Sequence, residues 1–155
     1  MTRDGLKGED MAGKIISVNI SKDKGEKKHN IQKCMLIKDK GLKDDAHAGF
    51  MHRQVSLLAQ ESINKIKKMG IDVVPGDFAE NLTTEGIELP TLPIGTKLLV
   101  GDGIILRVTQ IGKECHARCA IFQQVGDCVM PREGIFTEVL TEGEIKVGDT
   151  IKVAQ

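Results

Sequence analysis

The stretch that indicates the fold most clearly is residues 97–111, KLLVGDGIILRVTQI. Two runs rich in aliphatic and β-branched residues, Lys97–Val100 and Ile104–Ile111, flank the turn sequence Gly101-Asp102-Gly103. A short Gly/Asp turn between two apolar runs is typical of a β-hairpin. We therefore predict two antiparallel strands joined by a tight turn.

Similar short apolar segments, bounded by turn residues, occur on both sides of this hairpin. The further strands that we predict are Lys14–Ile20, Ile31–Ile37, Gln54–Ala59, Ile135–Leu140, Glu144–Val147 and Thr150–Val153. Between them, Gln60–Met69 has apolar residues at helical spacing and ends before Gly70. Many short strands with one or two short helices favour a mainly β fold, a closed or partly closed β-barrel.

The chain has 155 residues, enough for one domain with a hydrophobic core. We expect a flexible leader over residues 1–13 and a single domain over residues 14–155. Ser21–Lys28 is polar and rich in lysine, which predicts an exposed loop.

The composition argues against two classes of partner. Lys plus Arg and Asp plus Glu are equal at 22 each, whereas proteins that bind nucleic acids or membrane surfaces usually carry an excess of basic residues. No signal-peptide pattern is present, and no apolar run reaches the roughly 20 residues that cross a bilayer. We therefore expect a cytoplasmic protein, whose four cysteines serve as thiols or ligands and not as a disulfide framework.

The segment with the most chemical potential is residues 112–119, GKECHARC, which follows a predicted strand. Nearby cations such as Lys113 favour the thiolate of Cys115, and a thiolate binds soft metals and attacks as a nucleophile. A structural zinc site built from Cys115 and Cys119, with His116 and Cys128 as further candidate ligands, is a second interpretation, although a second pair of closely spaced ligands is missing. A third interpretation is that a free cysteine is simply a small buried apolar residue, and we favour it for Cys34 and Cys128. For Cys119, a buried structural role and a role in the site are equally favoured.

Three further segments could contact a ligand. Residues 44–57 contain His47 and Arg53, and an arginine can hold a phosphate with two parallel hydrogen bonds. Residues 76–82 contain Asn81, whose amide could pair with a pterin-like edge or simply form a turn. Residues 130–134 present Arg132 ahead of a strand, where it could meet an anion or form a surface ion pair.

Taken together and in order, these segments resemble the MOSC family, named for the C-terminal domain of molybdenum-cofactor sulfurases. The resemblance rests on Asp45–Gly49, Arg53–Leu57, Gly76–Leu82, Leu92–Gly95, the Cys115 segment and Val147–Asp149. It implies a barrel-like, mainly β fold and a role with the molybdenum–pterin cofactor (molybdopterin). The implied partners are that cofactor and the proteins that synthesise or use it.

The resemblance also implies roles for individual residues. Cys115 best matches the family's signature cysteine, a metal ligand or sulfur carrier, and Cys119 is close enough to be its equivalent. The cofactor phosphate would be held by Arg53, Lys113 or Arg132, with backbone amides of Asp45–Gly49. His47 and Asn81 would orient the pterin, and His116 is a further candidate contact.

Two rival functions stay open at this point. The first is a molybdenum-dependent reductase of N-hydroxylated compounds, which the family's oxidoreductase branch implies. The second is a non-enzymatic structural zinc protein or adaptor. Molybdenum and pterin content distinguishes the cofactor interpretation from the zinc interpretation.

Overall fold

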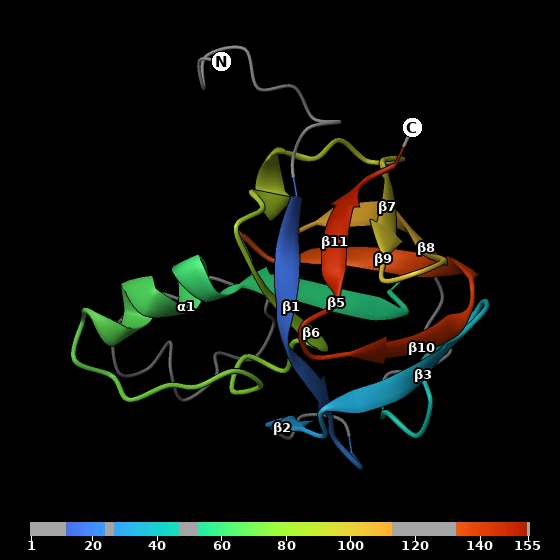
Figure 1. Cartoon of the computed structure of the whole chain (residues 1–155). Coiled ribbons are helices and arrows are strands. Elements are labelled where there is room, and N and C mark those ends of the chain that lie inside the picture. The colour runs from blue at the N-terminus through green and yellow to red at the C-terminus, as the bar shows by residue number, and fades with distance from the viewer. Residues whose placement is uncertain (1–11, 24–26, 47–52, 113–132, 155) are drawn as a thin grey trace.

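The structure is a computed structural model that describes residues 12–23, 27–46, 53–112 and 133–154 (Figure 1). Its elements follow one another as β1 (Ala12–Ile20), β2 (His29–Asn30), β3 (Lys33–Ile37), β4 (Gly41–Leu42), β5 (Val55–Ala59), α1 (Gln60–Lys67), β6 (Leu82–Glu85), η3 (Leu89–Thr91), β7 (Lys97–Val100), β8 (Ile104–Ile111), β9 (Ile135–Thr141), β10 (Gly143–Lys146) and β11 (Thr150–Val153).

Seven of the described strands form a closed ring. The order of hydrogen-bonded neighbours is β11-β7-β8-β9-β5-β6-β1, and β1 pairs again with β11, Ala12 opposite Lys152. All pairs in the ring are antiparallel except β5–β6, which is parallel. A smaller sheet of β10, β3 and β4 lies against one end of the ring (Figure 1). The predicted β-barrel is therefore confirmed.

Strand β5 shows how alternating residues divide between the two sides of the barrel wall. Val55, Leu57 and Ala59 belong to the main core cluster inside the barrel. Leu58 belongs to a second cluster, together with residues of α1. Because side chains alternate along a strand, Ser56 shares the outer face with Leu58. All of β5 is buried, since both of its faces are covered.

Helix α1 covers part of that outer face (Figure 1). Ile63 and Ile66 are fully buried and pack in the second cluster with Leu58, Phe78 and Phe136. The helix is amphipathic because these apolar residues recur at helical spacing, while its other positions are mostly exposed. Among the described residues, no helix is long and apolar enough to span a membrane.

The predicted hairpin over residues 97–111 is present. β7 and β8 have the predicted bounds, and Gly101 adopts a positive φ of 60° in the turn between them. The other predicted strands and the helix are present with ends shifted by no more than two residues, whereas β2, β4 and β6 were not predicted.

Most of the predicted leader, residues 1–11, lies outside the described residues. The leader and the domain bounds therefore stay predictions.

Candidate functional site

A buried polar network covers the outer face of β5, β6 and β1. The backbone N–H and the hydroxyl of Ser56 donate to Asn81 Oδ1 at 3.0 and 3.2 Å. The backbone N–H of Asn81 donates back to Ser56 Oγ and to its carbonyl, both at 3.0 Å. The Asn81 side-chain amide donates to the carbonyl of Asn19 at 3.2 Å and to Asp45 Oδ2 at 3.1 Å. Asn81 is 1% exposed, so these bonds hold its side chain inside the protein.

The same network contains a fully buried ion pair. Lys28 Nζ lies 2.7 Å from Asp45 Oδ1, and neither side chain is exposed. The backbone N–H of Ser21 donates to the same oxygen at 3.0 Å, and Lys28 Nζ also donates to Ser21 Oγ at 3.1 Å. Burial by itself would raise the pKa of Asp45, but hydrogen bonds from Lys28 and Ser21 and the charge of Lys28 lower it below its usual value. Asp45 is therefore held as a carboxylate.

Glu80 is a second buried carboxyl group, in a different environment. Its Oε2 accepts hydrogen bonds from the Gly76 backbone N–H at 2.9 Å and the Thr83 hydroxyl at 2.8 Å. Its Oε1 has no hydrogen-bond partner among the described residues. Burial raises the pKa of Glu80 to about 7, against the effect of those hydrogen bonds. The Glu80 carboxyl group therefore titrates close to neutral pH.

Arg53 lies next to this face, two residues before the start of β5. Its Nε donates to Gln110 Oε1 at 3.0 Å, and its guanidinium lies 5.2 Å from the centroid of the Phe136 ring. The Gln110 amide in turn donates to the carbonyl of Gly112 at 2.7 Å. No described residue accepts a hydrogen bond from the terminal amino groups of Arg53. These groups form the fork with which an arginine binds a phosphate or carboxylate.

Three distant parts of the sequence meet around Arg53. The Gly112 backbone N–H donates to the carbonyl of Gly134 at 2.6 Å, and Ile135 pairs with both Leu57 and Ile111. Glu133 is bound to α1, because it accepts a hydrogen bond from the Ser62 hydroxyl at 2.6 Å and forms an ion pair with Lys65 at 2.9 Å. The start of β5, the end of β8 and the start of β9 therefore lie side by side.

Of the residues predicted to form the site, the structure describes Arg53 and Asn81. The others lie outside the described residues: His47, Lys113, Cys115, His116, Cys119 and Arg132. Asn81 has a structural role in the described part of the protein, since its amide is bound on both sides, and its predicted contact with the pterin stays a prediction. Within the described part, no group of three or more acidic, His or Cys side chains is placed to hold a metal ion.

Three buried residues of this network were not predicted from the sequence. Lys28 was expected in an exposed loop, and that expectation is wrong for Lys28 and Ser21, which are 2% and 5% exposed. Lysine is almost never fully buried without a partner, and the sequence does not show that Lys28 has one. A lysine in a lysine-rich segment is therefore expected to be exposed. Glu80 lies within a segment that was singled out, but only its neighbour Asn81 was considered.

Cys34 was expected to be buried and is half-buried, packed against the core.

Known proteins resemble this chain in two ways: one family model matches its sequence, and several solved structures share its fold. The family model described as the MOSC domain matches residues 44–152. The YuaD protein of Bacillus subtilis has a similar structure, with a TM-score of 0.77 at 21% identity over 92% of this chain and 96% of that one.

Two further solved structures have the same fold. YiiM of Geobacillus stearothermophilus has a TM-score of 0.69 at 19% identity, over 92% of this chain and 75% of that one. YiiM of Escherichia coli has a TM-score of 0.65 at 15% identity, over 94% of this chain and 70% of that one. A search of curated proteins gave no match.

Proposed function

We propose, from the premise that this chain belongs to the MOSC domain family, that it binds the molybdenum–pterin cofactor and handles its metal or its sulfur through a cysteine thiolate. The family as a whole is associated with the molybdenum cofactor. The protein partners in this proposal are those that synthesise the cofactor or incorporate it.

The observation that carries the proposal is the geometry of Arg53. Its guanidinium is fixed from two directions, by Gln110 at its Nε and by the ring of Phe136 against its face. A fixed guanidinium loses little conformational entropy when it binds an anion, so its terminal amino groups are prepared for a phosphate. The cofactor carries such a phosphate, and the chemistry of Arg53, held by Gln110 and Phe136, fits it.

The position of Arg53 supports the rest of the proposed site. The described residues end at Gly112 and resume at Glu133, and both ends lie close to Arg53 through Gln110 and Gly134. The residues on either side of positions 113–132 therefore lie at this part of the barrel wall, and the sequence between them contains Lys113, Cys115, His116, Cys119 and Arg132.

In this proposal each group has a limited task. Arg53, with Lys113 or Arg132, binds the phosphate, and His47 orients the pterin. The Cys115 thiolate binds molybdenum or carries sulfur for it, with Cys119 as the alternative thiol, since soft thiolate ligands suit both tasks. The bound cofactor would supply the redox or sulfur-accepting chemistry, and the protein would supply its binding and orientation.

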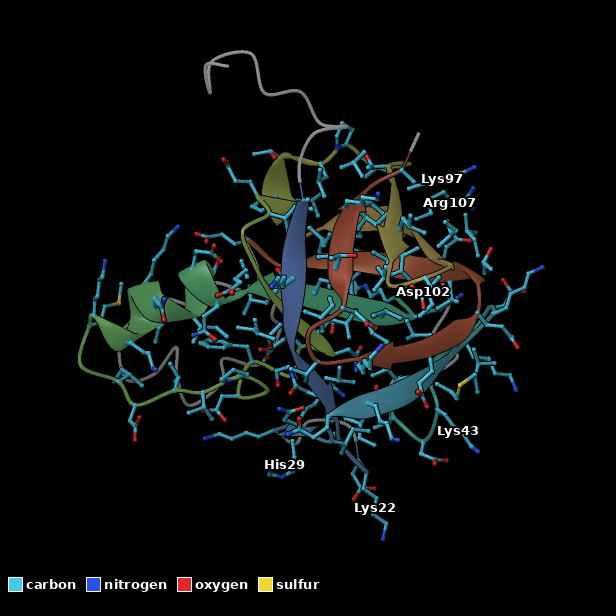
Figure 2. All side chains as sticks on the ribbon, viewed as in Figure 1. Lys22, His29, Lys43, Lys97, Asp102 and Arg107 are labelled. Carbon is cyan, nitrogen blue, oxygen red and sulfur yellow. The ribbon has the colours of Figure 1, made fainter. Side chains whose placement is uncertain are left out.

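The test is to purify the protein without oxygen from a host that makes the cofactor, and to measure molybdenum, zinc and released pterin per chain. The variants are Arg53→Met, Cys115→Ser and Cys119→Ser. The matched control for the arginine is Arg107→Met, because Arg107 lies on β8 and forms an exposed ion pair with Glu138 at 3.0 Å. Figure 2 shows Arg107 pointing outward from the barrel.

The expected result is molybdenum with pterin in the wild type and in Arg107→Met, and about a tenfold or greater loss of retention in Arg53→Met. Loss in only one of the two serine variants would identify the working thiol. Zinc without pterin, lost in both serine variants, would contradict the proposal and support a structural metal site.

A further inference from the structure

We infer that Lys28 and Asp45 form a buried positioning pair that holds the outer barrel face on which the Arg53 side chain is mounted. This inference rests on the proposed function for what Arg53 binds. Lys28 lies outside residues 44–152, the part of the chain that the family model matches, so the inference extends the functional unit beyond that part.

The first step is the environment of the pair. Lys28 Nζ and Asp45 Oδ1 are 2.7 Å apart with both side chains fully buried, whereas Lys22 and His29 from the same part of the chain point outward in Figure 2. Removing two charges from water is costly, and removing one partner leaves a buried charge without compensation. The loop before β2 and the turn after β4 are therefore fixed to each other.

The second step leads from the ion pair to strand β5. The remaining oxygen of Asp45, Oδ2, accepts a hydrogen bond from the Asn81 side-chain amide at 3.1 Å. That bond turns the Asn81 carbonyl oxygen towards Ser56, whose backbone N–H donates to it at 3.0 Å. Asp45 therefore fixes the side chain that binds the backbone of β5.

The third step leads from β5 to Arg53. Ser56 on β5 pairs directly with Phe136 on β9 in the antiparallel ladder. Directly paired residues project to the same face of a sheet, and the guanidinium of Arg53 lies over the ring of Phe136 on that face. Each link from Lys28 to Arg53 is therefore a hydrogen bond, a strand pair or a ring contact.

A mutation that breaks the pair should loosen this face before the far side of the barrel. We would replace Lys28→Met and, separately, Asp45→Asn, and combine both changes. Lys146→Met is the control for losing a lysine, because Lys146 pairs with Asp149 at 3.0 Å while 61% exposed. Val100→Ala, in the fully buried core on β7, is the control for a general loss of stability.

The first readout is hydrogen–deuterium exchange, which does not need the cofactor. In Lys28→Met we expect about tenfold or more faster exchange over residues 53–59 and 76–81, with exchange over residues 97–108 as in the wild type. Val100→Ala, which lies in that second segment, should instead speed exchange over residues 97–108. The double variant should be no worse than the single ones, because the residues act as one unit. Unchanged exchange over residues 53–59 would overturn the inference.

The second readout compares cofactor affinity at matched melting temperature. Groups that hydrogen-bond directly to a metal ligand typically change metal affinity about 10–100-fold when they are removed, and we take the lower end for this pair, which acts on Arg53 through intervening residues. We expect Lys28→Met to bind the cofactor at least about tenfold more weakly than Val100→Ala, while Lys146→Met resembles the wild type. Equal affinity in Lys28→Met and Val100→Ala would show that the pair only stabilises the fold. A wild type that binds no cofactor would contradict the proposed function, and the exchange experiment would still decide whether the pair holds this face.

Discussion

Ser56 and Phe136 lie directly opposite each other on β5 and β9, where a buried polar network meets a buried apolar cluster. Ser56 belongs to the buried polar network with Asn81, and Phe136 belongs to the apolar cluster beneath α1. Arg53 lies against the same ring, at 5.2 Å from its centroid. The ring against which the candidate anion-binding arginine lies therefore belongs to a buried apolar cluster and is paired with a strand held by the polar network.

The contact between Arg53 and Phe136 should be measurable as a coupling energy. In a double-mutant cycle of Arg53→Met and Phe136→Leu, we expect a coupling of about 0.5–1 kcal/mol in the free energy of unfolding, because the ring face attracts the cation. Urea denaturation of the four proteins measures it. The same cycle with Arg107→Met in place of Arg53→Met should be additive.

Asn81 should contribute strongly to stability. Asn81→Ala would leave buried hydrogen-bonding groups of Ser56 and Asp45 without the amide that now binds them. We expect a loss of about 2–4 kcal/mol, since each buried polar group without its partner costs about 1–3 kcal/mol. Asn64→Ala, which removes an exposed hydrogen bond with Gln60, should change stability by less than about 0.5 kcal/mol. Similar losses in the two variants would contradict this account of the network.

Two glycines with the same backbone angle allow a test of close packing. Gly76 and Gly95 both have a φ of 97°, but a Cβ at Gly76 would lie 2.1 Å from the carbonyl oxygen of Lys28, while a Cβ at Gly95 would meet nothing within 4 Å. Gly95→Ala should lose only about 1 kcal/mol from backbone strain. Gly76→Ala should lose at least about 2 kcal/mol more, because the backbone must move. Chemical denaturation of both variants checks the difference, and equal losses would rule out the close approach.

Glu80 should make stability depend on pH in the range where most carboxyl groups do not titrate. Its folded pKa of about 7 is above the ordinary value of 4.5, so the folded state binds the proton more tightly than the unfolded state. The stabilisation by the protonated form is complete below pH 4.5 and is lost as the pH rises to about 7. At about 1.4 kcal/mol per pH unit, the full loss is about 3 kcal/mol.

Glu80→Gln removes that titration and keeps the hydrogen-bond acceptor for Gly76 and Thr83. We expect the variant to gain stability relative to the wild type between pH 5 and pH 8, measured by denaturation at each pH. A constant difference between the two proteins over this range would show that Glu80 does not titrate there. Glu61→Gln, on the exposed side of α1, is the matched control.

The strands with a regular pattern were predictable because their residues satisfy one rule, an apolar run between turn residues. β7, β8 and β11 obey it, and their predicted bounds are those of the structure. β6 was missed because Thr83 and Thr84 look exposed in the sequence, although both are fully buried. Glu80 and Asn19 bind the Thr83 hydroxyl, and Asn19 lies 64 residues away in the sequence, where a local rule does not look.

The candidate site was predictable only in part, for the same reason. The chemistry of Arg53 could be inferred from the residue type, but its supports, Gln110 and Phe136, come from strands far away in the sequence. The burial of Lys28 depends on Asp45, which lies 17 residues further along the chain. Long-range pairing of this kind is decided by the closed barrel and not by local propensity.

The pairing of β1 with β11 also sets an order of events during synthesis. β1 is among the first described segments to leave the ribosome, but its partner, Thr150–Val153, is made after every other described strand. The ring therefore cannot close until Val153 has been translated, and until then the Ala12–Lys14 part of β1 lacks its β11 partner. Nascent chains stalled before residue 150 should be digested by protease, and chains released beyond residue 155 through a linker should resist it.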